Sequence, residues 1–193
     1  MPQTIAIIGA GPLGRWLALE AARAGYAVFL EDVMPSNLHH AKEELRRELG
    51  PEALSGAAVS HSNAPTSGAV PGRVVLVSTV EDAVREADLA IDCVPDELES
   101  KLEIFCLLDR MAPPRTVLVT PTTRLSIADL ASCTYRADRC VAIVAEAADL
   151  ASYESREVLL RTTSKTSVEA TDRVRSFWMR LGFAVRIEPD PAE

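Results

Sequence analysis

The sequence has little basic charge, few aromatic residues and no long apolar run. Its 20 Lys and Arg residues are outnumbered by 28 Asp and Glu residues, which gives a net charge of −8. Nucleic acids and anionic membranes attract clustered basic residues, so we expect neither as a partner. A membrane-spanning helix needs about 18 or more consecutive apolar residues, and the sequence contains no such stretch.

Cysteine and histidine are also scarce. The four cysteines form no C-x-x-C pair, and the three histidines lie far from them in the sequence: Cys93, Cys106, Cys133, Cys140, His39, His40 and His61. This spacing favours neither a metal site nor a disulfide framework, so we interpret the cysteines as small apolar residues. The amino-terminal residues lack the basic and apolar segments of a secretion signal, and we expect a cytoplasmic protein.

Apolar residues make up 48% of the chain, enough for one sizeable core, and we expect a single domain over residues 1–193. Short apolar runs typical of buried strands alternate with longer amphipathic segments typical of helices. Such alternation predicts βαβ units and a mostly parallel sheet with helices on both faces. The expected strands are 5–8, 27–32, 74–78, 89–94, 116–120, 140–145, 158–161 and 183–187, and the expected helices are 11–24, 36–49, 80–86, 98–110, 126–131 and 166–181.

Several boundaries have specific signals. Ser36 or Asn37 is the expected cap of the second helix, and Thr166 with Glu169 fits a capping box for the last helix. Residues 50–73 are rich in Gly, Ala, Ser and Pro and have little periodicity. We interpret them as a flexible surface loop with at most one helical turn.

The segment "IAIIGAGPLGRW" places Gly9, Gly11 and Gly14 between a strand and a helix, in the spacing G-x-G-x-x-G. Gly9 permits the tight turn, Gly11 permits a pyrophosphate to approach the backbone, and Gly14 permits close packing of the helix on the sheet. Pro12 and Leu13 lie in the first helical turn, whose N–H groups and dipole can bind phosphate without a lysine. Together these features predict a dinucleotide-binding Rossmann fold.

Asp32 ends the second strand, 18 residues beyond Gly14, and is placed to accept hydrogen bonds from the adenine ribose hydroxyls. A 2′-phosphate would be repelled by Asp32 and by the neighbouring Glu31, and residues 33–38 contain no Lys or Arg to receive it. The sequence therefore favours NAD over NADP.

Four segments, in order, resemble the NAD-binding domain of 3-hydroxyacyl-CoA dehydrogenases, enzymes of fatty acid metabolism: "IAIIGAGPLGRWLALEAARAGYAVFLED", "EADLAIDCVPDELESK", "TPTTRLSIADLA" and "TSVEATDRVRSFWMRLGFAV". The resemblance implies an NAD-dependent oxidoreductase that acts on an acyl-CoA. It also implies that Asp96 and Lys101 contact the cofactor near the nicotinamide ribose. Both residues also fit a solvated helix start, and Asp is one methylene shorter than the Glu usual in the family.

The sequence departs from the family where its general base lies. The histidine position falls on Val144, which cannot accept a proton. Glu146 is the best substitute base, with Tyr153 and Glu157 as others. Glu157 matches the carboxylate that orients the family's histidine, but it also fits an ordinary polar strand residue.

A second departure concerns the segment that contacts the substrate, where Thr122 and Thr123 keep hydroxyl groups and Pro121 removes one N–H donor. A plain turn fits this segment equally well. The resemblance also implies a helical domain that closes over acyl-CoA, and residues 185–193 stand about where that domain would begin.

Three functions stay open from the sequence. The chain binds NAD, or senses its redox state, without turnover; or it is an active oxidoreductase on a hydroxyacyl-CoA or another alcohol; or it is one chain of a two-chain enzyme completed by a separate helical partner. A homodimer and a monomer are equally compatible with the sequence.

Overall fold

The computed structural model describes residues 3–55, 72–145 and 156–192, and the following bounds refer to them. The strands are β1 Thr4–Ile8, β2 Ala27–Glu31, β3 Leu54–Ser55, β4 Val74–Val77, β5 Leu89–Asp92, β6 Val117–Pro121, β7 Cys140–Val144, β8 Glu157–Thr162 and β9 Ala184–Pro189. The helices are α1 Pro12–Arg23, α2 Pro35–Leu49, α3 Val80–Val84, α4 Leu98–Met111, α5 Ile127–Ser132 and α7 Val168–Arg180, with 3₁₀ turns at Pro51–Ala53 and Ala137–Arg139.

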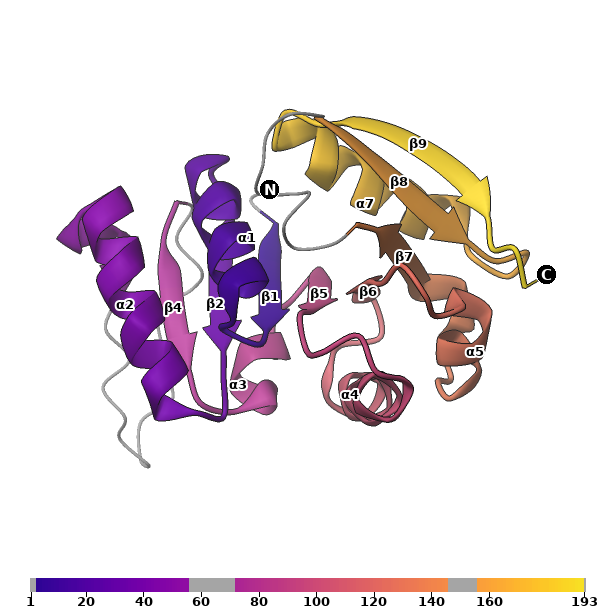
Figure 1. The fold of residues 1–193 in the computed structure, drawn as a ribbon, viewed down its shortest axis with the longest axis horizontal. Coiled ribbons are helices and arrows are strands. Elements are labelled where there is room, and N and C mark those ends of the chain that lie inside the picture. Colours follow the sequence, from indigo (N-terminus) through magenta and orange to yellow (C-terminus); the bar gives the residue numbers. More distant parts are fainter. Residues whose placement is uncertain (1–2, 56–71, 146–155, 193) are drawn as a thin grey trace.

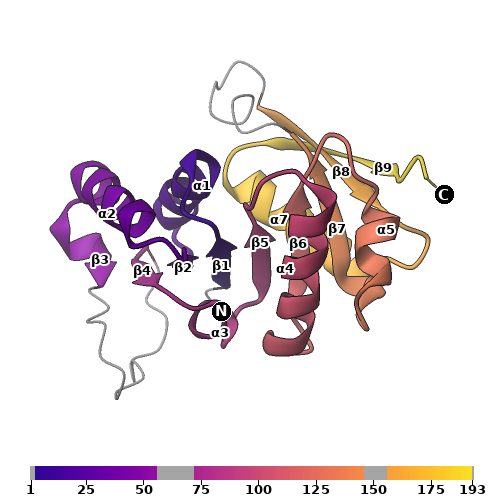
Figure 2. The ribbon, with the colours of Figure 1, turned by 60° about the horizontal axis from the view of Figure 1, so that its bottom comes forward.

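The strands of the described residues form one sheet in the order β3-β4-β2-β1-β5-β6-β7-β8-β9 (Figure 1; β3 is labelled in Figure 2). Neighbouring strands run parallel except β7 and β8, which are antiparallel. The chain builds outward from β1 in one direction and then from β5 in the other, so the strand order reverses between β1 and β5. This confirms the expected doubly wound α/β fold.

Helices cover both faces of the sheet, and alternate residues of each strand supply the two cores. Ile5 and Ile7 of β1 belong to the core under α1, α2 and α7, whereas Ala6 and Ile8 belong to the core over α3, α4 and α5. This division follows from the two-residue period of a strand, and it explains why β1 is apolar at every position. No helix in the described ranges has the length and apolar character needed to cross a membrane.

The turn from β1 into α1 depends on two glycines. Gly9 adopts φ +105°, in the left-handed region that favours glycine. A Cβ on Gly14 would overlap the carbonyl oxygen of Gly9 and lie 3.4 Å from Cγ2 of Ile7. The expected close packing of α1 on β1 is therefore present, and Gly14 is the residue that permits it.

Two expected helix starts are wrong by one or two residues. The cap of α2 is Met34 rather than Ser36 or Asn37, because Pro35 takes the first helical position. The cap of α7 is Ser167, whose hydroxyl accepts a hydrogen bond from the Ala170 N–H at 3.2 Å. Thr166 instead donates to the Cys140 carbonyl oxygen at 3.1 Å and ties the start of α7 to β7.

The segment expected to be a loop over residues 50–73 has regular structure at its start. After a 3₁₀ turn at Pro51–Ala53, β3 pairs parallel with β4, with Leu54 opposite Val74 and Ser55 opposite Val75. Residues 56–71 lie outside the described ranges. The sequence signal for a two-residue edge strand is weak because its short length leaves no alternation to detect.

We predict that Gly14→Ala lowers the free energy of unfolding by roughly 1–3 kcal/mol, because the new methyl group overlaps the Gly9 carbonyl oxygen. Urea denaturation followed by circular dichroism measures the loss. Gly11→Ala is the matched control: its Cβ would have no atom within 4 Å and its φ of −65° suits any residue. Equal stability of the two variants would contradict the close helix–strand contact.

Candidate functional site

A cleft of about 1230 Å³ runs along the carboxyl ends of the parallel strands, across the point where the strand order reverses. Open α/β sheets bind ligands at this position, because loops diverge there to opposite faces. Five strands contribute to the lining of the cleft, each with its last residue or the residue directly after it: Ile8, Glu31, Ser78, Asp92 and Pro121.

The start of α1 forms one wall of this cleft. Gly11, Pro12 and Leu13 all line it, and the helix cap Gly11 makes no side-chain capping bond. The N–H groups of the first helical turn have no partner within the helix, so they can bind an anion. Since nothing lies within 4 Å of a Cβ built on Gly11, the space over this glycine is open to a ligand.

Asp32 holds this turn in place from β2. Its Oδ2 accepts hydrogen bonds from the Ala10 N–H at 2.8 Å and from the Asn37 side-chain amide at 3.0 Å, and its Oδ1 accepts one from the Met34 N–H at 2.7 Å. A carboxylate offers about four acceptor positions, so about one is left for a ribose hydroxyl. The sequence predicted the acid but not its second task, which is to fix both the glycine turn and the start of α2.

Glu31, directly before Asp32, also lines the cleft and is buried. Burial, with a smaller contribution from the Asp32 charge, raises the pKa of Glu31 from 4.5 to about 7. Its side chain therefore changes charge near neutral pH at the end of the cleft where Asp32 lies. The sequence identified Glu31 only as a negative neighbour of Asp32.

Asp96 lies in the cleft on the other side of the reversal point. Its Oδ2 accepts a hydrogen bond from the Thr123 N–H at 3.3 Å, whereas its Oδ1 is buried and has no partner in the structure. An unpaired buried acceptor beside a cleft suits a ligand hydroxyl, because such a donor would remove the cost of leaving the oxygen unsatisfied. The contact between Asp96 and a ribose stays a prediction.

Lys101 lies elsewhere than expected. It is fully buried, does not line the cleft, and its Nζ lies 3.1 Å from Oδ2 of Asp92 and 3.0 Å from the Thr120 hydroxyl. Thr120 in turn donates to Asp92 at 2.7 Å. Burial raises the pKa of Asp92, while Lys101 and Thr120 oppose that shift. Lys101 thus stabilises the end of β5, and it is not among the residues that line the cleft.

Of the candidate catalytic residues, the structure describes Thr122 and Glu157, and neither lines the cleft. The Thr122 hydroxyl is buried and accepts hydrogen bonds from Arg124 N–H at 3.3 Å and Leu125 N–H at 3.0 Å, so it stabilises a turn, and Thr123 lines the cleft instead. Glu157 begins β8, is exposed, and lies 3.4 Å from Arg186. Glu146 and Tyr153 lie outside the described residues.

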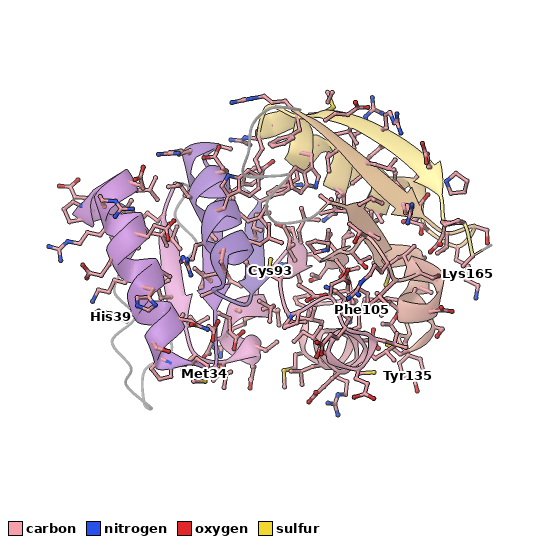
Figure 3. The ribbon with its side chains drawn as sticks, viewed as in Figure 1. Met34, His39, Cys93, Phe105, Tyr135 and Lys165 are labelled. Atoms are coloured by element: carbon pink, nitrogen blue, oxygen red, sulfur yellow. The ribbon has the colours of Figure 1, made fainter. Side chains whose placement is uncertain are left out.

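Val144 ends β7 and is half-buried, and the next residue, Ala145, lines the cleft. None of the described residues that line the cleft is a histidine. His39 lies on α2, on the other side of α1 from Cys93, which follows β5 (Figure 3). In both ribbon views α2 lies beside β2 and β4, whereas β7 lies in the other half of the sheet, beyond β5 and β6 (Figures 1 and 2).

Two cleft residues went unrecognised in the sequence. Asp92 ends the apolar segment "LAID", and an acid at the end of a buried strand is a signal that could have identified it. Arg124 follows β6 and had no distinguishing pattern around it. Its Nη2 donates to the Asp96 carbonyl oxygen at 2.7 Å, which places it at the rim of the cleft.

Comparisons with known proteins agree on one family. The family model described as "3-hydroxyacyl-CoA dehydrogenase, NAD binding domain" matches residues 4–182. The probable 3-hydroxybutyryl-CoA dehydrogenase of Bacillus subtilis is 31% identical over 137 residues, which are 71% of this chain and 46% of the relative. The mitochondrial hydroxyacyl-coenzyme A dehydrogenase of Sus scrofa is 31% identical over 140 residues, 70% of this chain and 43% of the relative.

Solved structures show the same fold. The crystal structure of 3-hydroxybutyryl-CoA dehydrogenase from Escherichia coli K12 matches with a TM-score of 0.78 and 22% identity, over 98% of this chain and 39% of that chain. A diketoreductase matches with a TM-score of 0.78 and 24% identity, over 97% of this chain and 64% of that chain. The chain spans less than half the length of the two curated relatives above.

We predict that Gly11→Val abolishes NAD binding, because the branched side chain would fill the open space over the glycine turn. The backbone angles of residue 11, φ −65° and ψ −176°, permit valine, so the fold should be kept. Isothermal titration calorimetry measures the affinity, and a thermal melt controls for folding. A folded valine variant that binds NAD normally would place the diphosphate elsewhere.

We also predict that Glu31→Gln stabilises the protein at pH 8.5 but not at pH 5. The raised pKa means that the folded state retains a proton that the unfolded state releases, so wild-type stability falls as pH rises from 4.5 to about 7. Glutamine removes that loss, by at most roughly 3 kcal/mol. Urea denaturation at both pH values tests this against Glu81→Gln, an exposed acid of α3 that should show no such difference.

Proposed function

The chain belongs to the family of the 3-hydroxyacyl-CoA dehydrogenase NAD-binding domain, and on that premise we propose that it holds NAD without, by itself, catalysing the family's histidine-dependent hydride transfer. It would act as a binding module, or as a sensor of whether the cofactor is oxidised or reduced. Bound NAD would supply hydride chemistry; the residues of this chain would bind and orient it.

The described cleft fits NAD at three points. Gly11 leaves open space against the first turn of α1 for a diphosphate. Asp32 keeps about one free acceptor position for the adenosine ribose, and Asp96 has an unpaired buried oxygen for the second ribose. Glu31 and Asp32 would repel a 2′-phosphate, which supports NAD over NADP.

The observation that carries the proposal is that no histidine is among the described residues that line the cleft. The resemblance to the family puts its histidine position on Val144, which has no group that accepts a proton. Without a base, the hydroxyl proton of an alcohol substrate has nowhere to go when a hydride leaves. The same cleft could therefore bind NAD and still catalyse no oxidation of an alcohol.

Three other carboxylates are poorly placed to act as that base. Glu31 lies at the end of β2, four strand spacings or about 19 Å from β7. Asp92 is paired with Lys101 and Thr120, and Glu157 is exposed beside Arg186. A substitute base from the segment that contains Glu146 and Tyr153 is an alternative that kinetics tests.

The finer features of the proposal concern partners and location. An acyl-CoA or another small molecule would meet the nicotinamide end of the cleft, either in this chain alone or with a homodimer mate or a separate helical chain. The four free thiols, of Cys93, Cys106, Cys133 and Cys140, suit a reducing compartment, and we propose the cytoplasm.

The test combines calorimetry with a turnover assay on the chain alone. We predict that NAD and NADH bind, that NADP binds at least about ten-fold more weakly because of charge repulsion, and that acetoacetyl-CoA with NADH gives no loss of NADH absorbance. The Gly11→Val variant serves as the control for binding at the cleft.

Turnover in the wild type that disappears in Gly11→Val would overturn the proposal and favour an active oxidoreductase. The variants Glu146→Gln and Glu157→Gln would then show which carboxylate acts as the base. Absence of NAD binding in the wild type would overturn the proposal altogether.

A further inference from the structure

Acidic side chains outnumber cationic ones in the part of the cleft that the structure describes. Its described lining includes six carboxylates and a single guanidinium, that of Arg124; the acids are Glu31, Asp32, Glu81, Asp92, Asp96 and Glu103. Residues 56–71 and 146–155, which the structure does not describe, contain no Lys or Arg in the sequence. Neither of these segments can therefore bring a second lysine or arginine side chain to the cleft.

The contacts of Arg124 orient its guanidinium without neutralising it. Nη2 donates a hydrogen bond of 2.7 Å to the main-chain carbonyl oxygen of Asp96, and Nε lies 4.0 Å from the Asp96 carboxylate. The side chain is 69% exposed, and an ion pair of that length in water contributes little. The planar group is held from one side while most of its N–H donors remain available.

The position of Arg124, in the turn after β6, would place it at the nicotinamide end of a bound cofactor. In the proposed binding mode, Asp32 after β2 would hold the adenosine end and the first turn of α1 would hold the diphosphate beside β1, so the nicotinamide end would point toward β5 and β6. Arg124 follows β6 and lines the cleft together with Thr123 and with Ala145 after β7. A second ligand that meets the nicotinamide would therefore lie within reach of this guanidinium.

We propose that the cleft takes, beside NAD, a small oxo or hydroxy acid whose carboxylate pairs with Arg124. This inference rests on the proposed function, because the cofactor sets which end of the cleft is left for the second ligand. A carboxylate matches the fork of a guanidinium and carries one negative charge. A phosphate monoester carries nearly two, which the single guanidinium of the described lining cannot balance, so the phosphates of an acyl-CoA fit this position less well.

The experiment uses the full chain saturated with NADH and follows the binding of acetoacetate, an oxo acid, and of methyl acetoacetate, its neutral ester, by calorimetry. Wild type should bind acetoacetate at least about ten-fold more tightly than the ester. In Arg124→Gln that preference should disappear while NADH affinity stays within about two-fold. Arg175→Gln, an exposed change of the same charge on α7 away from the cleft, should behave like wild type.

Each alternative outcome overturns the inference. Equal binding of acid and ester by wild type, or no binding of either, would show that the cleft has no carboxylate site. Loss of NADH affinity in Arg124→Gln would show that the guanidinium contacts the cofactor instead. Acetoacetyl-CoA that competes more strongly than acetoacetate, and loses affinity in Arg124→Gln, would assign the cation to a coenzyme phosphate. Failure of NADH to bind wild type would instead refute the proposed function itself.

Discussion

The cleft depends on the carboxylate of Asp32, which accepts hydrogen bonds from two main-chain N–H groups and one side-chain amide around the first crossover. It accepts the N–H of Ala10 in the glycine turn, the N–H of Met34 before α2, and the amide of Asn37 within α2. The Ala10 carbonyl is held in turn by Arg15 at 2.9 Å, so both polar groups of that residue are satisfied within the protein. The turn is therefore preorganised, and a ligand would not have to order it on binding.

On the other side of the reversal point, a buried ion pair plays the corresponding part. Asp92 and Lys101 are fully buried, and Thr120 bonds to both of them. Taking two charges out of water is costly, and the Coulomb attraction offsets this cost only when the geometry is good and the remaining polar positions are filled. Asp92 Oδ1 accepts the Val94 N–H at 2.9 Å, which fills one more position and fixes the loop that carries Asp96 to the cleft.

The parts of this fold and site that could be predicted from the sequence are those set by local spacing. The glycine positions, the strand–helix alternation and the acid at the end of β2 are local patterns, and each was found where expected. The sequence predicted that Lys101 contacts the cofactor, whereas its ammonium bonds to Thr120 of β6. Thr120 is 19 residues away, and local spacing does not show that the two side chains meet. For Thr122 the sequence showed a hydroxyl group near the cleft but not its direction. In the structure the hydroxyl accepts a hydrogen bond from the N–H of Leu125 in the following turn. Arg124 could be recognised only once the signs of all the surrounding charges were known.

The antiparallel placement of β8 next to β7 has a consequence for the size of what the molecule can hold. Carboxyl ends of strands line up only while the strands keep one polarity, so the row of such ends that begins at β3 stops at β7. Six inter-strand spacings separate those two strands, about 29 Å in all. The change of strand direction at β8 thus limits the combined length of a dinucleotide and a second ligand that lie end to end along the sheet.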